Sequence, residues 1–162
     1  MSTIFFTSDT HFYHHNILKF EPETRPFGTV EEMNEEIVKR WNSIVGPRDH
    51  VWHLGDVLFG TADNIKIISR LNGTKHLVMG NHDELDAGLY RKYFKSVQAI
   101  KKKYGVVMSH VPIHPVSLDR WSTNLHGHLH SKEVGDSRYI NVCVEHHDLY
   151  PVSLDLIRAR LE

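Results

Sequence analysis

Short apolar runs alternate along this chain with amphipathic segments, and this alternation predicts strands and helices in turn. Strand-like composition covers residues 4–7, 51–54, 76–79, 97–100, 106–109 and 139–144, with a very short run at 124–126. From Val30 to Trp41 the apolar side chains recur every three or four positions, and Thr29-Val30-Glu31-Glu32 has the form of a capping box. Strands that alternate with helices are typical of the α/β class.

Weaker patterns predict the remaining elements. Residues 64–71 place apolar side chains on one helical face and stop at Asn72-Gly73, residues 88–94 form a weaker helix, and Ser153 caps a final helix through residue 160. The strands at 97–100 and 106–109 flank the triplet Lys101-Lys102-Lys103, which we expect at the tip of a charged hairpin. No repeat, low-complexity block or linker interrupts residues 1–162, which predicts a single domain.

Composition narrows the class of protein. A chain of 162 residues is long enough for one domain with a real core and short for two. Its 19 basic and 20 acidic residues give a net charge of −1, which does not support a broad nucleic-acid or membrane surface. The lone Cys143 excludes an internal disulfide and a Cys-rich zinc site, and neither a signal peptide nor a membrane span is evident. We therefore expect a cytoplasmic location.

Histidine is the compositional outlier, with 14 copies, and imidazole is the commonest metal ligand. Many of these histidines stand in five short motifs: Asp9-Thr10-His11, Gly55-Asp56, Gly80-Asn81-His82-Asp83, Ser109-His110 and Gly127-His128-Leu129-His130. Four motifs follow an apolar strand directly, and the last follows the short run at 124–126. Ligands of α/β sheets gather beyond the carboxyl ends of strands, so we expect these side chains in one crevice.

Apart from Asp83, the five motifs supply two carboxylates, one carboxamide and five imidazoles. This set suits two divalent ions that share one carboxylate, with one histidine left for proton transfer. Asp9 and His11 are two positions apart, so in extended backbone they project to the same side and chelate one ion. Each motif alone has an ordinary structural explanation, such as a turn or a cap. The ordered set predicts metal-assisted hydrolysis of a phosphate ester.

The order of the motifs from Asp9 to His130 resembles the calcineurin-like metallophosphoesterase superfamily, and the short length resembles its small single-domain bacterial and phage branch. The resemblance implies a layered sandwich of two mixed β-sheets flanked by helices, with a binuclear metal site at the C-terminal ends of the strands. It implies that one ion takes Asp9, His11, Asp56 and His130. It implies that the other ion takes Asp56, Asn81, His110 and His128, so that Asp56 bridges.

The resemblance also implies a division of catalytic roles. A hydroxide that bridges the two ions attacks phosphorus, while His82 protonates the leaving oxygen. Asp83 or a backbone carbonyl orients His82. Mixed nitrogen and oxygen ligands without thiolate favour Mn²⁺, with Fe, Zn, Co or Ni as alternatives.

The substrate is less sharply defined. Protein Ser/Thr phosphatases of the superfamily carry Gly-Asp-x-x-Asp-Arg-Gly, whereas Phe59 stands at the second Asp position here and no Arg follows it. We expect a small phosphate ester, a phosphodiester before a monoester, with nucleotides among the candidates. The alternatives are a non-catalytic scaffold and a nuclease; the presence of His82 argues against the first, and the net charge argues against the second and against stable nucleic-acid binding. The sequence leaves the oligomeric state open.

Three further residues could contact substrate. Arg25 lies in the long loop before the capped helix, where it either clamps a phosphate or forms a surface salt bridge. His14 follows the first motif and either touches substrate or begins a solvent-facing helix. Asn81 is a substrate contact as well as a metal ligand, and His53 is expected in the core.

Overall fold

The computed structural model describes residues 2–161. Its strands are β1 Ile4–Thr7, β2 His50–His53, β3 Thr74–Val78, β4 Ser96–Gln98, β5 Ile100–Lys103, β6 Val106–Ser109, β7 Asn124–His126, β8 Tyr139–Asn141 and β9 Val152–Ser153. Its α-helices are α1 Ile17–Phe20, α2 Val30–Ile44, α3 Ala87–Tyr90 and α4 Leu154–Ala159, and its 3-10 helices are η1 Ala62–Arg70, η2 Pro115–Arg120 and η3 Val144–His147. None of the helices in this range is both long and apolar enough to cross a membrane.

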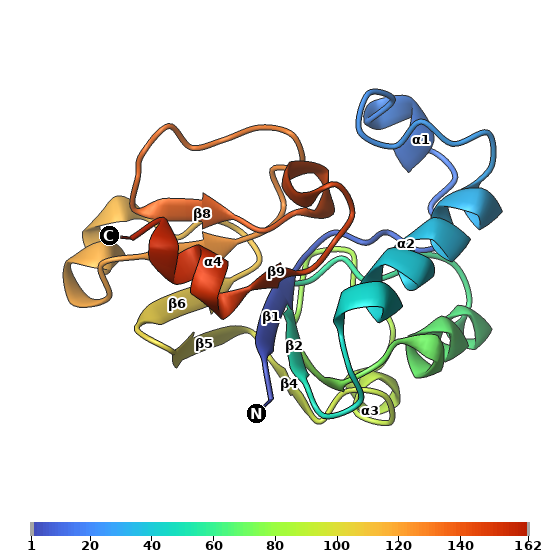
Figure 1. The fold of residues 1–162 in the computed structure, drawn as a ribbon, viewed down its shortest axis with the longest axis horizontal. Helices are drawn as coiled ribbons and strands as arrows, with labels where there is room; N and C mark the ends of the chain where they lie inside the picture. Colours follow the sequence, from blue (N-terminus) through green and yellow to red (C-terminus); the bar gives the residue numbers. More distant parts are fainter. Residues whose placement is uncertain (1, 162) are drawn as a thin grey trace.

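The strands form two mixed sheets, which confirms the expected architecture. The first has the order β4-β3-β2-β1-β9, with β1 to β4 parallel and β9 antiparallel to β1. The second has the order β5-β6-β7-β8, with β5 antiparallel and the other three strands parallel. Strands β1 and β2 lie at the centre of the molecule, with β5, β6 and β8 on one side and α1 and α2 on the other (Figure 1).

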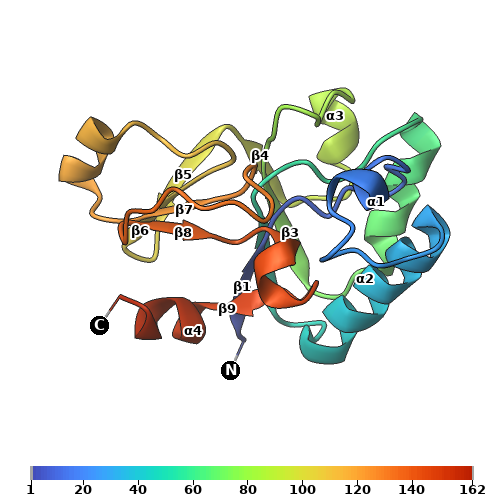
Figure 2. The same cartoon turned by 90° about the horizontal axis from the view of Figure 1, so that it is seen from above.

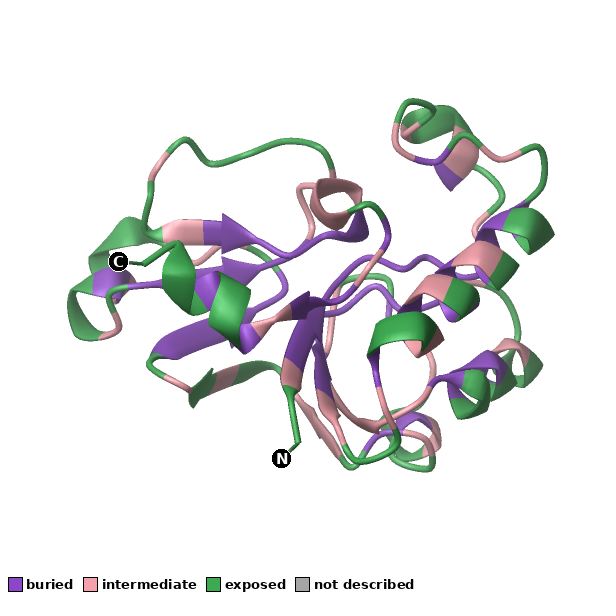
Figure 3. Cartoon of the chain, viewed as in Figure 1, coloured by how far each residue is buried: buried purple, intermediate pink, exposed green. Residues whose placement is uncertain are grey.

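Successive side chains of β1 point to opposite faces, and this alternation creates the layers. Phe5 packs in a cluster with Met33 and Trp41 of α2, whereas Phe6 packs in a second cluster with Met108 and Leu125 of the other sheet. The first sheet is therefore buried between helices and the second sheet (Figure 2). The central strands are buried while the outer helix faces are exposed (Figure 3).

Both helix caps predicted from the sequence, Thr29 and Ser153, are present. The Thr29 hydroxyl accepts a hydrogen bond from Glu32 N at 3.2 Å, and the Glu32 carboxylate accepts one from Thr29 N at 3.2 Å. The Ser153 hydroxyl accepts a hydrogen bond from Leu156 N at the start of α4. These contacts satisfy amide groups that a helix cannot pair internally.

Two predicted helices differ in type or length. Residues 62–70 form a 3-10 helix in place of the helix predicted at 64–71, although Ile65 and Ile68 are buried as its pattern indicates. Residues 87–90 form α3, which is shorter than the helix predicted at 88–94 and begins where the Asp86 carboxylate accepts a hydrogen bond from Gly88 N. In both places tertiary packing overrides a weak helical preference.

The lysine triplet is not the tip of a hairpin, so that prediction was wrong. Lys101, Lys102 and Lys103 lie within β5 and pair with β6, and the turn consists of Tyr104 and Gly105, which both have positive φ. Lysines on an exposed edge strand block pairing with other chains, which is why this strand lacks an apolar pattern. The preceding strand β4 belongs to the other sheet.

The strand predicted at 139–144 ends early, at Asn141. The Asn141 side chain accepts a hydrogen bond from Cys143 N at 2.8 Å, which turns the backbone into η3. Strand β9 has only two residues and pairs with Phe5 and Phe6, so it is too short to leave a periodic pattern in the sequence.

Candidate metal centre

The five motifs converge at the C-terminal ends of β1, β2, β3, β6 and β7. Asp9, His11 and His130 form a first group in which the possible ligand atoms all lie within 4.8 Å of one another. His11 Nε2 lies 3.6 Å from Asp9 Oδ1, and His130 Nε2 lies 3.7 Å from the same oxygen. These separations fit three atoms arranged around one ion.

Asp56, His110 and His128 form a second group beside the first. His110 Nε2 lies 3.3 Å from Asp56 Oδ2, and Asn81 Oδ1 lies 3.0 Å from both His110 Nε2 and His128 Nδ1. Asp56 Oδ2 also lies 3.6 Å from His11 Nε2 of the first group. The carboxylate of Asp56 therefore stands between the two groups.

Two buried atoms of the first group lack a hydrogen-bond partner. Asp9 Oδ2 accepts hydrogen bonds from Ser8 Oγ, His128 N and Cys143 Sγ at 2.5, 2.9 and 3.1 Å. Asp9 Oδ1 and His11 Nε2, by contrast, are buried and unpaired. An unpaired buried polar atom is costly, and a cation bound between these two atoms would satisfy both. The residues therefore fit a metal ion.

The ligand histidines are oriented through their other ring nitrogen. His110 Nδ1 lies 2.7 Å from Leu54 O, and His130 Nδ1 lies 3.0 Å from Glu145 Oε1. A carbonyl or carboxylate oxygen in this place accepts a hydrogen bond from Nδ1–H, which leaves Nε2 without a proton and free to bind a metal. Both rings therefore direct an unprotonated Nε2 at the centre when a metal is bound.

Most ligands stand at backbone positions that side chains rarely occupy. Five candidate ligands have positive φ: Asp9 58°, His11 49°, Asp56 55°, His128 70° and His130 49°. Each such residue costs on the order of 1–3 kcal/mol, and such residues cluster at functional sites. The extended backbone assumed for Asp9 and His11 in the sequence analysis is therefore wrong, because left-handed turns bring the two side chains together.

Two motif glycines allow the turns to touch. A Cβ on Gly80 would lie 2.6 Å from Asp56 N, and a Cβ on Gly127 would lie 2.8 Å from Ser8 Cβ. Both distances are too short for any side chain, so glycine is required where one ligand turn packs against the next.

The carboxylates and imidazoles shift each other's protonation. Burial favours the neutral form of Asp9, but His11, His110 and His130 outweigh it and hold the pKa of Asp9 well below its usual range. Burial disfavours the charged form of His110, but Asp56 and Asp9 outweigh it and raise the pKa of His110 to about 9. The ionised carboxylates thus attract positive charge, and a bound cation would replace the proton on His110.

Arg25 is not a substrate clamp and not a surface salt bridge, so both predictions for it were wrong. Its side chain is 0% exposed, because it lies beneath the first ligand turn. Its guanidinium donates to Asp9 O, to Thr10 O at 3.0 Å and to Glu145 Oε1 at 2.6 Å. Arg25 thus holds the backbone of that turn and the carboxylate that orients His130.

Asp83 does not orient His82 in this structure, contrary to one of the two predicted options. The Asp83 carboxylate accepts hydrogen bonds from Asp56 N, Val57 N and Gly80 N at 2.9, 2.9 and 2.7 Å. Burial outweighs these contacts and raises the pKa of Asp83. Its observed role is to hold together the two turns that carry Asp56 and Asn81.

His14 and His82 flank the first group. The His14 ring stacks on Phe59 with centroids 3.9 Å apart, and its Nδ1 lies 3.0 Å from His11 Nδ1. His82 is exposed, and the centroid of its ring lies 4.9 Å from that of Phe59 and 6.0 Å from that of His11. The backbone N–H of His82 donates a hydrogen bond to Asp56 Oδ1. His82 is thus close to the centre while its ring remains accessible to a substrate. His53 is buried, as expected.

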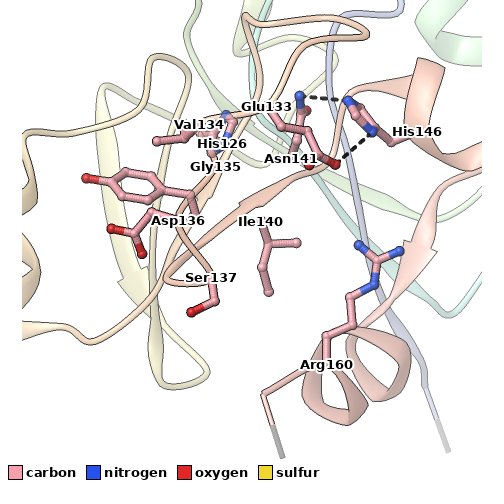
Figure 4. Close-up of a pocket in the computed structure, with 11 residues that line it drawn as sticks. His126, Glu133, Val134, Gly135, Asp136, Ser137, Ile140, Asn141, His146 and Arg160 are labelled. Atoms are coloured by element: carbon pink, nitrogen blue, oxygen red, sulfur yellow. Dashed lines mark hydrogen bonds and ion pairs between the residues drawn. The ribbon is translucent and has the colours of Figure 1, made fainter.

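Two residues that were not predicted from the sequence hold the His130 turn from behind. His146 Nε2 lies 2.7 Å from His130 O, and Asn141 Nδ2 donates to the same oxygen at 3.0 Å. Both residues line a cavity of about 310 Å³ beneath the loop at 131–138 (Figure 4). Glu145 was missed as well, although His146 and Glu145 are neighbours in a histidine-rich segment that could have signalled them.

Comparisons with known proteins agree with this geometry. The family model of calcineurin-like phosphoesterases matches residues 2–156, and the chain belongs to this family of metal-dependent phosphoric ester hydrolases. An uncharacterized protein of Methanocaldococcus jannaschii, MJ1445, is 33% identical over all of this chain and 93% of its own length.

Two further relatives fit the small branch of the family. The gene 66 protein of Mycobacterium phage L5 is 32% identical over 81% of this chain and 79% of its own length. The crystal structure of AQ665, a protein of unknown function from Aquifex aeolicus, superposes with a TM-score of 0.80 at 29% identity and covers 98% of this chain and 99% of its own.

Proposed function

We propose that this protein is a binuclear metal-dependent phosphodiesterase in which Asp56 bridges the two ions. The observation that carries the proposal is the position of Asp56 Oδ2, which lies 3.6 Å from His11 Nε2 and 3.3 Å from His110 Nε2. A carboxylate shared between two ligand groups is the arrangement that keeps two ions close together. Asp9, His11 and His130 complete the first ion site, and Asn81, His110 and His128 complete the second.

The side chains around the ions divide the work of hydrolysis. When bound, the two ions supply positive charge to the phosphoryl oxygens and activate the attacking water. His82 donates a proton to the leaving oxygen, since it is the one imidazole of the five motifs outside the two ligand groups. His14 positions His11 through its ring nitrogen, and its contact with substrate stays a prediction.

The proposed substrate is a small phosphodiester, with nucleotides among the candidates and monoesters as weaker substrates. Mn²⁺ is the proposed metal, with Fe, Zn, Co or Ni as alternatives, because the ligands are nitrogen and oxygen without thiolate. The net charge of −1 supports a small substrate over a nucleic-acid strand. The cytoplasmic location and the absence of stable nucleic-acid partners stay predictions.

Hydrolysis of bis- and mono-(p-nitrophenyl) phosphate, measured side by side with Mn²⁺ and after chelation, tests the proposal. We expect hydrolysis that requires the metal and favours the diester. A preference for the monoester would redirect the enzyme to a phosphatase. No hydrolysis of either ester by protein that has bound two ions would contradict the proposal and favour the scaffold.

A further inference from the structure

A small pocket opens beside His82, which forms part of its lining. It has a volume of about 230 Å³ and is lined by Leu58, Phe59, Gly60, His82, Glu84 and Leu85. This volume is below the range of sites for drug-sized ligands and suits a fragment of about one ring. No role in metal binding or proton transfer has been assigned to five of these six residues.

Phe59 forms a fixed wall of the pocket. Its ring stacks on the ring of His14, with centroids 3.9 Å apart and an interplanar angle of 11°. The centroid of the His11 ring lies 5.2 Å away, at an interplanar angle of 21°. Its backbone is held at both ends, because Phe59 N donates to Phe12 O and Phe59 O accepts from Asn64 Nδ2, each at 2.8 Å. A phenylalanine fixed in this way presents a preformed apolar face to a ligand.

The position of His82 determines what would occupy the pocket. In the proposed reaction the His82 imidazole lies within hydrogen-bond reach of the leaving oxygen. The substituent on that oxygen must therefore start beside the His82 ring, and His82 itself lines this pocket, which is open to that substituent. We propose that this pocket is the leaving-group subsite of the enzyme, an inference that rests on the proposed function.

The lining of the pocket predicts the chemistry of the leaving group. Leu58, Phe59 and Leu85 provide apolar surface for a flat ring, whereas Glu84 provides an exposed carboxylate at the rim. A carboxylate accepts hydrogen bonds from hydroxyl or ammonium groups and repels anions. The subsite therefore selects esters whose leaving alcohol carries a neutral or cationic ring and disfavours alcohols with a second negative charge.

Three methyl aryl phosphodiesters test this selectivity. Their leaving phenols are 4-cyanophenol, 4-(trimethylammonio)phenol and 4-hydroxybenzenesulfonate, which are neutral, cationic and anionic. For the Mn²⁺-loaded wild-type protein, we expect kcat/KM, corrected for the acidity of each phenol, to decrease from the cationic to the neutral to the anionic ester. In Glu84→Gln we expect the ratio of cationic to anionic ester to fall by about fivefold, as for one exposed charge pair.

Phe59→Leu tests the apolar wall. We expect KM for the neutral ester and the inhibition constant of free 4-cyanophenol to rise by about tenfold, with two ions still bound and kcat for that ester within about twofold. Glu133→Gln removes an exposed carboxylate from the loop at 131–138, outside this pocket, and is the matched control that should leave the charge ratio unchanged.

The outcomes separate this subsite from the function on which it rests. An unchanged charge ratio in Glu84→Gln, or an unchanged inhibition constant in Phe59→Leu, would overturn the subsite while the hydrolysis itself stands. Loss of bound metal in Phe59→Leu would also overturn it, since Phe59 would then act only by packing on His11. Wild-type protein that hydrolyses none of the three esters would contradict the proposed function instead.

Discussion

Several candidate metal ligands, among them Asp9 and His130, are held by a partner on the side away from the ion. Ser8 and Cys143 hold one oxygen of Asp9, and Glu145 holds the outer nitrogen of His130. The ligands themselves could be predicted because each stands in a short motif after a strand. Their partners could not, since the contact between Arg25 and Glu145 joins positions 120 residues apart and neither stands in a motif.

Replacing Glu145 should weaken the first ion site. In Glu145→Gln the side chain keeps its shape, but the buried charge that faces His130 Nδ1 and Arg25 is lost. Substitutions of such partners reduce metal affinity by about 10–100-fold, and we expect this loss for one of the two ions. Calorimetric titration of the apoprotein with Mn²⁺ measures both binding steps.

Glu133→Gln serves as the control, because Glu133 is exposed and only approaches His146, at 3.7 Å. Thermal melts of both variants establish that they are folded. If Glu145→Gln binds both ions with wild-type affinity, Glu145 does not orient His130 for metal binding.

Replacing His82 should separate catalysis from metal binding. We expect His82→Ala to bind two ions and to lose about 10²–10⁴-fold in kcat, since the leaving oxygen then departs without a proton donor. The loss should be greatest for esters with poor leaving groups. Metal analysis of the purified variant checks the assignment, and a content of one ion per chain would identify His82 as a ligand instead.

At the scale of the elements, the turns after β1 and β2 are tied together by a buried polar chain. Gly55 N donates to His53 Nδ1, so His53 Nε2 carries the proton and donates to Thr10 Oγ1 at 2.9 Å. Thr10 Oγ1 in turn donates to Val57 O at 2.8 Å. This chain fixes the turn with Asp9 against the turn with Asp56.

The buried His53 should make stability depend on pH. Burial, the largest cause, lowers its pKa to about 3 from the usual 6.5, so the unfolded chain binds this proton more readily than the folded chain. The free energy of unfolding therefore falls as the pH drops below about 6.5, by at most about 1.4 kcal/mol per pH unit for this group. Unfolding of the apoprotein in urea between pH 7 and 4.5 measures the slope.

His53→Gln keeps a donor toward Thr10 but does not titrate in this range. We expect its free energy of unfolding to be lower than that of the wild type at pH 7 and to approach it as the pH falls. A stability difference that is the same at pH 7 and pH 4.5 would show that His53 is not held neutral by the fold.

The strands that carry ligands were the easiest elements to predict. β1 and β2 are buried on both faces and have a continuous apolar and aromatic composition, so the sequence locates them to within a residue or two. β5 and β9 could not be assigned, because an edge strand of lysines and a strand of two residues leave no period. The sheet partner of β4 depends on long-range pairing that no local pattern encodes.

At the scale of the whole molecule, the metal centre lies where the two sheets meet. The first ligand group combines Asp9 after β1 with His130 after β7, and the second combines Asp56 after β2 with His110 after β6. Each ion would therefore connect both sheets, and Asp56 would connect both ions. The two ligand groups are implied by the family resemblance that the order of the motifs carries, whereas the left-handed turns that bring the ligands together could not be predicted.

The metal content of Asp56→Asn tests the central claim most directly. Wild-type protein loaded with Mn²⁺ and freed of excess metal should contain two ions per chain. Because Asp56 is shared, the variant should bind both ions more weakly. Its metal content after the same treatment should therefore fall well below one ion per chain. A wild-type protein that binds one ion, or a variant that loses one ion and keeps the other with full affinity, would contradict a shared-carboxylate binuclear centre.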